Sequence, residues 1–335
     1  CPCRLDHEPT LEAIEADTTS NLGSTSNGAD HIVITHHDFW SQALTLSTHR
    51  SATMRAITVD VQDIYDEFNY GIEGAVPIRD FLAYAYDNWQ SPAPSYVVLV
   101  GDGHYDPKEN YYTGTNSYIP AYLLSVDPWI GETAADNRYV TFVGDDPLPD
   151  MMLGRLAVNS SAEASAFVSK IIDYENTPVT GDWQQQILAI ADNADLAGDF
   201  AAISENLLDT YVTPLSPPYS ADKVYYGVTH DLASAKQAIE DEINAGKLIV
   251  NYIGHSGITA WGDDLLKASQ VAGLSNGGKL PIMLDMTCYD GSFHYSDMFA
   301  STAIFSRADG KGSIANWTAT GEGIASGHDF LNRGF

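Results

Sequence analysis

The chain has 335 residues, of which 16 are Lys or Arg and 45 are Asp or Glu, so its formal net charge at pH 7 is −29. A chain this acidic is a poor partner for nucleic acid or an anionic membrane surface, and it favours cations such as metal ions or basic peptides. Its hydrophobic content of 44% is ordinary for a globular protein, and we find no apolar run long enough to span a membrane and no signal-peptide pattern in its first residues.

The first part of the chain alternates between strand and helix patterns after a polar start. Residues 1–30 are rich in turn-forming residues and are predicted to be a tail or linker from a preceding module. The predicted strands that follow are residues 31–35, 56–61 and 95–102. The predicted helices are residues 38–51, with Asp38 as N-cap, 75–89, and 161–176, opened by Ser161. Between them, residues 103–150 are predicted to form a long loop.

The alternation restarts after residue 180. The predicted strands are residues 185–192, 222–228, 247–254, 280–288 and 312–317, and the predicted helices are residues 197–212, 231–246 and 296–310. Repeated strand–helix units indicate parallel sheets covered by helices. We therefore predict an α/β fold of two packed subdomains, residues 31–180 and 181–335, and one arrangement would join them through one continuous sheet.

Two reactive side chains follow neighbouring apolar strands of the second subdomain. His255 stands in the segment GHSG after the strand at 247–254, and Cys288 ends the strand at 280–288. Ligands of open α/β sheets bind beyond the carboxyl ends of the strands, so both side chains are expected at one edge. A buried cysteine or a hydrogen-bonded histidine is often only structural. Their shared position beside glycines instead favours a thiol nucleophile with an imidazole partner. The other two cysteines, Cys1 and Cys3, are too few for a disulfide framework.

The segments around these two residues resemble the gingipain family of cysteine peptidases. The resemblance is carried by NYIGHSGITAWG (251–262) and LDMTCYDGSF (284–293), and upstream by VVLVGD, ETAADNRY, GRLAV and KIIDYE. It runs from about residue 31 to the end. It implies a caspase-like α/β fold in two subdomains, with Cys288 as nucleophile and His255 as general base or proton donor. It also implies an oxyanion hole from the main-chain N–H groups of Cys288 and Ser256, where Ser256 replaces a family glycine.

The resemblance further implies a third catalytic acid and a pocket for a basic side chain. Asp192 and Asp195 are both candidates for the acid that orients the histidine. Gingipains cut after Arg or Lys, and Asp199 lies nearest the position of the acid at the floor of their pocket; it could equally be a helix N-cap. The remaining predicted pocket residues are Ile253, Met286 and Trp317, the last as a substitute for a family tryptophan. The resemblance implies a peptide or protein substrate, no cofactor for catalysis, structural calcium, and a secreted or cell-surface location.

Two other functions compete with the peptidase hypothesis. Oxygen and nitrogen ligands gather in THHDF (His36, His37, Asp38), in GDGHYDP (Asp102, His104, Asp106) and in GDDPLPD (144–150). These clusters favour a metal-dependent hydrolase, although the sequence lacks a His-Glu-x-x-His zinc motif, and solvated acidic turns would look the same. The second alternative is a catalytically silent binding or scaffold module of the same family. The sequence leaves the metal sites, the oligomeric state and the natural substrate open.

Overall fold

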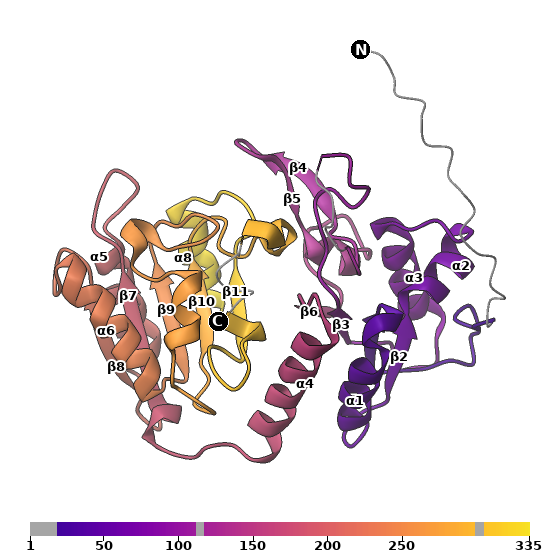
Figure 1. Cartoon of the computed structure of the whole chain (residues 1–335), viewed down its shortest axis with the longest axis horizontal. Coiled ribbons are helices and arrows are strands. Elements are labelled where there is room, and N and C mark those ends of the chain that lie inside the picture. Colours follow the sequence, from indigo (N-terminus) through magenta and orange to yellow (C-terminus); the bar gives the residue numbers. More distant parts are fainter. Residues whose placement is uncertain (1–18, 112–116, 299–304) are drawn as a thin grey trace, which may run out of the picture.

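Two separate parallel sheets form the framework of the protein, one in each half of the chain (Figure 1). The computed structural model describes residues 19–111, 117–298 and 305–335. The first sheet has the strand order β2-β1-β3-β6, and the second has the order β11-β10-β9-β7-β8. The arrangement with one continuous sheet is wrong, because no strand pairing among the described residues joins the two halves.

The strands agree closely with the apolar runs of the sequence. The first sheet consists of β1 (His31–Thr35), β2 (Ala56–Asp60), β3 (Tyr96–Val100) and β6 (Met152–Leu156). The second consists of β7 (Gln186–Ala191), β8 (Ser220–Tyr225), β9 (Ile249–Ile253), β10 (Ile282–Met286) and β11 (Ala315–Thr318). All eight predicted strands are present; the strand at 31–35 has the predicted bounds, and the ends of the other seven are shifted. β6 was not predicted, and neither was the antiparallel hairpin of β4 (Leu123–Asp127) and β5 (Gly131–Ala134), which lies in the predicted loop.

Helices cover both faces of each sheet. The first half carries α1 (Trp40–Arg50), α2 (Val61–Asn69), α3 (Ala75–Asn88) and α4 (Ser161–Asn176), and the second carries α5 (Phe200–Leu207), α6 (Leu232–Ala245) and α8 (Ala325–Gly334). Helices α2 and α8 were not predicted. Asp60 ends β2 and also accepts the N–H of Gln62, so it caps α2 at the point where the apolar run suggested a continuing strand.

Two predicted N-caps are wrong, and one predicted helix lies partly outside the described residues. Helix α4 is capped by Ser160, which accepts the N–H of Glu163, rather than by Ser161. Asp38 lies inside a short 3-10 helix that precedes α1 and does not cap α1. Of the predicted helix 296–310, residues 299–304 lie outside the described residues, and residues 305–307 are helical.

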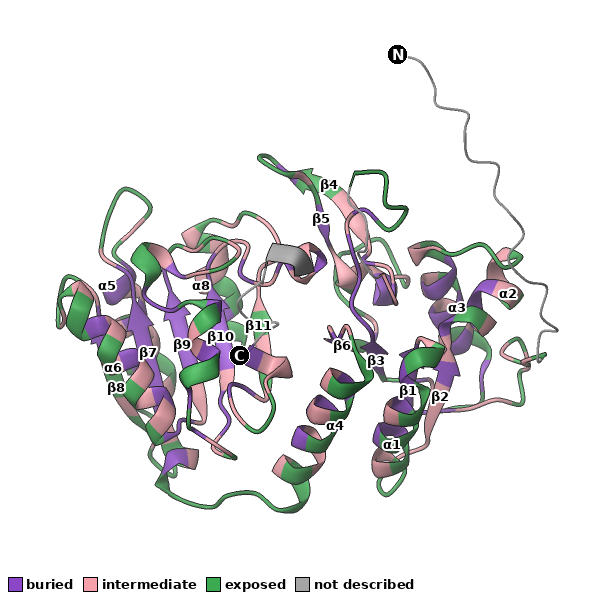
Figure 2. Ribbon diagram, viewed as in Figure 1, coloured by how far each residue is buried: buried purple, intermediate pink, exposed green. Residues whose placement is uncertain are grey.

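Alternating side chains place apolar residues on both faces of the central strands, which appear as buried segments in Figure 2. In the second sheet, Val250 and Met283 join the cluster beneath α6, while Ile253, Leu284 and Met286 join the cluster beneath α5. The strands of this sheet are therefore fixed from both sides. This rigid support matters because the loops at their carboxyl ends carry the predicted functional residues.

The two halves of the chain are joined by polar contacts as well as by the chain itself. Lys170 of α4 donates to the carbonyl oxygens of Ser306 and Ala308, and Thr133 of the hairpin donates to the carbonyl of Thr320. Residues 19–30, predicted as a tail or linker, lie against the first half, where Leu22 packs on its core. No described helix combines the length and apolar character needed to cross a membrane.

Candidate active site

The carboxyl ends of three adjacent strands bring the predicted catalytic residues to one edge. Strand β9 lies between β10 and β7, with Ile253 level with both Met286 and Ala191. Two residues beyond each strand end stand His255 and Cys288, and Asp192 directly follows β7. The prediction that His255 and Cys288 follow neighbouring strands is confirmed by this pairing. Parallel pairing places the three loops side by side, as an α/β ligand site requires.

The imidazole of His255 is held by a carboxylate and an aromatic ring. Its Nε2 atom lies 3.0 Å from Oδ2 of Asp195, and the Phe200 ring meets it edge-on with centroids 5.2 Å apart. The His255 side chain remains 48% exposed. A main-chain hydrogen bond from Ala197, together with the bond to His255, outweighs desolvation and lowers the pKa of Asp195. An ionised Asp195 at Nε2 leaves Nδ1 as the nitrogen that can exchange a proton with a substrate or thiol.

The second candidate acid, Asp192, holds the backbone rather than the ring. Its Oδ2 atom accepts the main-chain N–H of His255 at 3.2 Å, and its Oδ1 atom accepts that of Asn193 at 2.8 Å. Burial raises the pKa of Asp192, although these two hydrogen bonds oppose the shift. Of the two acids that the sequence left open, Asp195 contacts the imidazole and Asp192 positions the loop that carries it.

Two glycines of the histidine loop are required by the close approach of Asp192. A Cβ atom added to Gly254 would lie 2.4 Å from the Asp192 Cβ, and one added to Gly262 would lie 2.4 Å from its Oδ2. Such distances do not occur between real atoms, so any side chain there would force the loop away. By contrast, a Cβ atom at Gly257 would meet nothing within 4 Å. Gly254 and Gly262 are therefore needed for the packing of the loop against Asp192, whereas Gly257 is not.

The thiol of Cys288 is half-buried beside the loop that precedes α8. It accepts the N–H of Gly323 at 3.4 Å and lies 3.5 Å from the carbonyl oxygen of the same residue. Burial raises the pKa of Cys288 above its ordinary value of 9.0, the Gly323 N–H lowers it, and the charges of Glu322 and Asp127 raise it further. Within the described residues no hydrogen bond links Cys288 to His255. The resting thiol is therefore protonated at neutral pH.

This electrostatic environment predicts how fast Cys288 reacts with an alkylating reagent. Because the thiolate is the reactive form, the rate of alkylation by iodoacetamide should keep rising through about pH 9. The measurement is the modified fraction of the Cys288 peptide by mass spectrometry at each pH, with the peptide that carries Cys1 and Cys3 followed separately as a reagent control. A plateau below about pH 7 would instead show a preformed thiolate–imidazolium pair.

Two main-chain N–H groups at this edge have no partner in the described part of the chain. They belong to Ser256 and Cys288, the two residues predicted to form an oxyanion hole. The flanking loop residues are bonded, since Gly257 donates to Ala260 and Gly262 donates to His255. The Ser256 hydroxyl donates to the carbonyl of Cys288, which ties the two loops together. The serine that replaces a family glycine is thus a bridge between the loops that carry the two donors.

The predicted pocket residues have diverse environments. Asp199 is exposed and accepts the N–H of Ala202 at 3.0 Å, so it caps α5, whose first residue Phe200 packs against His255. Ile253 and Met286 are each 3% exposed and lie in the core cluster beneath α5. Their predicted role as pocket residues has no support from these positions, because strand alternation turns both side chains into the core.

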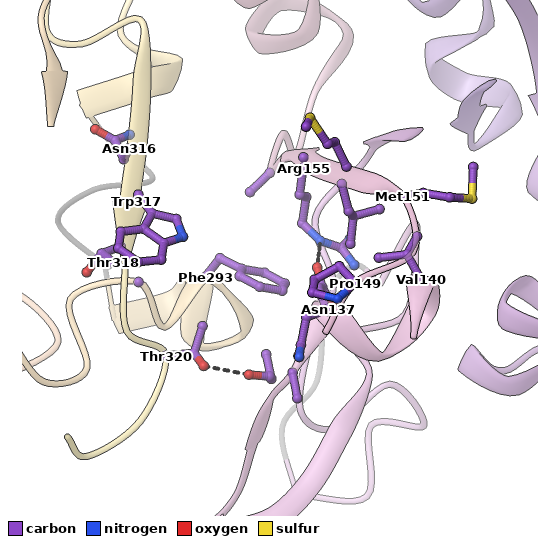
Figure 3. A pocket seen from close by; sticks show the side chains of 18 of the residues that line it. Asn137, Val140, Pro149, Met151, Arg155, Phe293, Asn316, Trp317, Thr318 and Thr320 are labelled. Atoms are coloured by element: carbon purple, nitrogen blue, oxygen red, sulfur yellow. Dashed lines mark hydrogen bonds and ion pairs between the residues drawn. The ribbon is translucent and has the colours of Figure 1, made fainter. Parts of the chain in front are cut away.

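Trp317 lines a large cavity between the two sheets. This cavity has a volume of about 940 Å³, and its walls come from edge strands β6 and β11 and from the loops between them. Figure 3 shows Trp317 and Thr318 on one side, Met151 and Val140 on the other, and Arg155 with Phe293 between them. The Arg155 guanidinium lies 4.6 Å from the centre of the Phe293 ring. A smaller hollow of about 530 Å³ lies directly at His255, lined by the segments 255–257 and 259–264.

The predicted metal ligands are mostly occupied by hydrogen bonds. Asp102 accepts the side-chain N–H of Asn159, and Asp106 accepts the main-chain N–H groups of Asn110 and Tyr111. Asp150, in the segment 144–150, likewise accepts two main-chain N–H groups. Among the described residues the one cluster of three close ligand side chains is His36, His37 and Asp38, whose members are mostly exposed.

Several residues that shape the site were missed by sequence reasoning. Tyr252 stacks on Trp261 with ring centroids 4.1 Å apart, and Trp261 donates to Asp290 at 3.3 Å, which connects the histidine loop to the cysteine loop. The motif TAWG contained this tryptophan, but its partner could not be read from local pattern. Phe200 and Gly323 were missed as well, because each lies far from His255 and Cys288 along the chain.

Comparison with known proteins identifies similar sequences and structures. Residues 24–335 match the family model described as peptidase family C25. Gingipain R2 of Porphyromonas gingivalis is 30% identical over 247 residues, which cover 71% of this chain and 30% of that protein. A Lys-gingipain of the same species is 25% identical over 233 residues, covering 69% of this chain and 12% of that protein. The chain thus spans less than a third of the length of these relatives.

A solved structure shows the same fold. The crystal structure of the Arg-specific cysteine proteinase gingipain R matches with a TM-score of 0.70 and 26% identity, over 90% of this chain and 66% of that chain. A complex of the pro- and mature domains of the corresponding Porphyromonas gingivalis protein matches with a TM-score of 0.69 at 25% identity. The predicted resemblance and the predicted caspase-like α/β fold are both confirmed by these matches.

Proposed function

The chain belongs to peptidase family C25, and on this premise we propose that it is a cysteine endopeptidase with Cys288 as nucleophile and His255 as proton carrier. The observation that carries the proposal is the common edge of β9 and β10. There the two side chains follow paired strands, together with two main-chain N–H groups that have no partner among the described residues. Asp195 at Nε2 of the imidazole adds the third member of a hydrolytic arrangement.

The proposed reaction proceeds through a thioester. When a peptide binds, His255 removes the thiol proton of Cys288, and the sulfur attacks the carbonyl carbon of the scissile bond. The N–H groups of Ser256 and Cys288 donate to the oxyanion of the tetrahedral intermediate. His255 then gives its proton to the leaving nitrogen as the C–N bond breaks. Water, deprotonated by His255, attacks the thioester, releases the acid product and restores the thiol.

The environment of each group supports its proposed role. The raised pKa of the Cys288 thiol means that a base must act during attack, and the exposed imidazole is available to do so. The ionised Asp195 carboxylate stabilises the imidazolium that forms when His255 accepts the proton. Catalysis needs no cofactor in this scheme. Structural calcium and a secreted or cell-surface location stay predictions that come from the family resemblance.

We propose that the enzyme cuts after Arg, and less efficiently after Lys. Two relatives carry Arg or Lys specificity in their names, and the net charge of −29 attracts basic substrates. The scarcity of basic residues in the chain also fits an enzyme that must avoid cutting itself, although general acidity for solubility would give the same composition. A scan of fluorogenic peptides that vary the residue before the scissile bond tests this specificity together with the peptidase activity.

Asp199 is the proposed acid for the basic side chain, and a charge-specific variant separates that role from helix capping. Asp199→Asn keeps an oxygen that can accept the N–H of Ala202 but removes the negative charge. We expect it to lower kcat/KM for Arg peptides by roughly tenfold or more relative to Ala peptides, because a charge-assisted hydrogen bond is lost. Asp199→Ala serves as the comparison that removes both functions. An unchanged Arg preference in Asp199→Asn would leave Asp199 only as a helix cap.

A further inference from the structure

The tip of the β4–β5 hairpin carries large apolar side chains that face solvent. Trp129 is 79% exposed, and its neighbours Val126 and Ile130 are exposed as well. A surface cluster of this kind usually marks a place where something binds, because exposed tryptophan surface is hydrated at a cost in free energy. The hairpin belongs to the first half of the chain, yet in Figure 1 it rises beside the carboxyl edge of the second sheet.

A buried carboxylate inside the tip fixes its conformation. Asp127 is only 7% exposed although the residues around it face solvent. Its Oδ1 atom accepts the main-chain N–H groups of Trp129 at 2.8 Å and Ile130 at 2.9 Å. The turn that presents the two side chains is therefore held by its own acid. Because the backbone of the turn is already ordered, less conformational entropy is lost when a ligand binds to the tip.

The same carboxylate attaches the tip to the loops that surround Cys288. The Tyr289 hydroxyl donates to Oδ1 of Asp127 at 3.2 Å, and the Glu322 N–H donates to Oδ2 at 2.6 Å. Tyr289 directly follows Cys288, and Gly323, next to Glu322, donates to the Cys288 sulfur. Burial raises the pKa of Asp127, but the hydrogen bonds that it accepts outweigh this effect and lower the pKa, so the anchor stays charged.

A second contact fixes the base of the hairpin to the same loop. Thr133 in β5 donates to the Thr320 carbonyl at 2.6 Å, and the Thr320 hydroxyl donates back to the carbonyl of Ala134. The hairpin is thus bonded to the second half at its tip and at its base. These bonds hold the hairpin backbone beside the loops that surround the thiol.

We propose that Trp129, supported by Ile130, forms an apolar subsite that binds one side chain of the peptide substrate close to the scissile bond. The inference rests on the proposed peptidase function and adds a second specificity element to it. A peptide attacked by Cys288 must pass the loops 288–289 and 321–323, and both loops bond to Asp127, which lies two residues before Trp129 in the hairpin tip. A flat aromatic side chain accommodates an aromatic or large aliphatic residue by stacking and apolar burial.

The test is a peptide series with one fixed residue before the scissile bond and a single phenylalanine moved through the three positions on either side. The wild-type enzyme should favour phenylalanine at one of these positions over glycine there. Trp129→Ala should lower kcat/KM for that peptide by roughly tenfold or more and leave the glycine peptide unchanged. Trp129→Phe should restore most of the preference. Trp40→Ala is the matched control, since Trp40 is an exposed tryptophan of α1 in the first half of the chain.

Three outcomes would overturn the subsite. The first is an equal decrease in kcat/KM for the phenylalanine and glycine peptides in Trp129→Ala. The second is a decrease in kcat/KM for the phenylalanine peptide in Trp40→Ala as large as that in Trp129→Ala. The third is a change in oligomeric state with no change in peptide preference, which would make the tip a contact between copies. If the wild-type protein cleaves no peptide, the proposed function fails, and binding of the same series to Cys288→Ala by fluorescence anisotropy then decides the subsite alone. Equal affinity for the phenylalanine peptide in Cys288→Ala with and without Trp129→Ala would exclude the apolar subsite.

Discussion

Replacing Cys288 by alanine is expected to abolish peptide cleavage, with kcat/KM lower by at least about four orders of magnitude. The variant keeps the oxyanion donors and the imidazole but has no atom that can form the thioester. His255→Ala should reduce kcat/KM by a comparable factor, because the Cys288 thiol has a raised pKa and needs a base at neutral pH. The two losses should not add in the double variant, since the residues act in one step. The measurement is initial-rate kinetics on the best fluorogenic peptide from the specificity scan.

The controls separate this reaction from the two competing functions. A Cys1→Ala/Cys3→Ala variant removes the other thiols of the chain and should retain full activity. Addition of EDTA should lower stability at most. Retained cleavage by Cys288→Ala together with immediate loss of activity in EDTA would instead favour a metal-dependent hydrolase. If the wild-type protein turns over no peptide, the silent binding or scaffold module becomes the better hypothesis.

The Gly254→Ala substitution is expected to damage both stability and activity, whereas Gly257→Ala in the same loop should be tolerated. The added Cβ at Gly254 would lie 2.4 Å from the Asp192 Cβ and 2.6 Å from the Tyr252 hydroxyl, both on well-packed residues. Overpacking of this kind costs about 1–3 kcal/mol of folding free energy. Because Asp192 also holds the main-chain N–H of His255, the displaced loop should move the imidazole and lower kcat/KM by roughly a hundredfold.

Thermal unfolding and peptide kinetics measure the two effects of the glycine substitutions separately. Gly257 is the matched control because a Cβ there has open space around it. Gly257→Ala should therefore change the melting temperature and kcat/KM little. Equal behaviour of the two variants would contradict the idea that Asp192 sets the position of the histidine loop. A loss of activity without a loss of stability in Gly257→Ala would point to close approach of substrate at that glycine.

Local sequence patterns could predict every strand of the two parallel sheets except β6, and the edge at which His255 and Cys288 lie. A strand that is buried on both faces reads as a continuous apolar run, and parallel pairing carries its following loop to the same edge as its neighbour's. The apolar run is a local pattern, and the shared edge follows from a general rule of parallel sheets, so neither inference needs a particular contact between distant side chains. Helix α2 was missed for the same local reason, because its apolar start at Val61 continued the run of β2 and hid the cap at Asp60.

The tertiary structure alone decided which acid faces the imidazole and what surrounds the thiol. Asp192 and Asp195 are equivalent in sequence, but the path of the loop after β7 turns Asp195 toward the ring and Asp192 toward the backbone. Ile253 and Met286, which were predicted as pocket residues, lie in the core cluster beneath α5, because side chains alternate between the two faces of packed strands.

The distant contacts had no signal in the sequence at all. Asp127 lies in a segment that was predicted to be a loop, more than a hundred residues before Tyr289 and Glu322, yet it accepts hydrogen bonds from both. Residues so far apart in the chain meet only through the packing of one sheet unit against the other, and that packing depends on the summed shape of many side chains. The sequence by itself therefore determined the chemical groups and the sheet edge that presents them. Only the folded chain decided the partners that orient those groups and the apolar surface beside them.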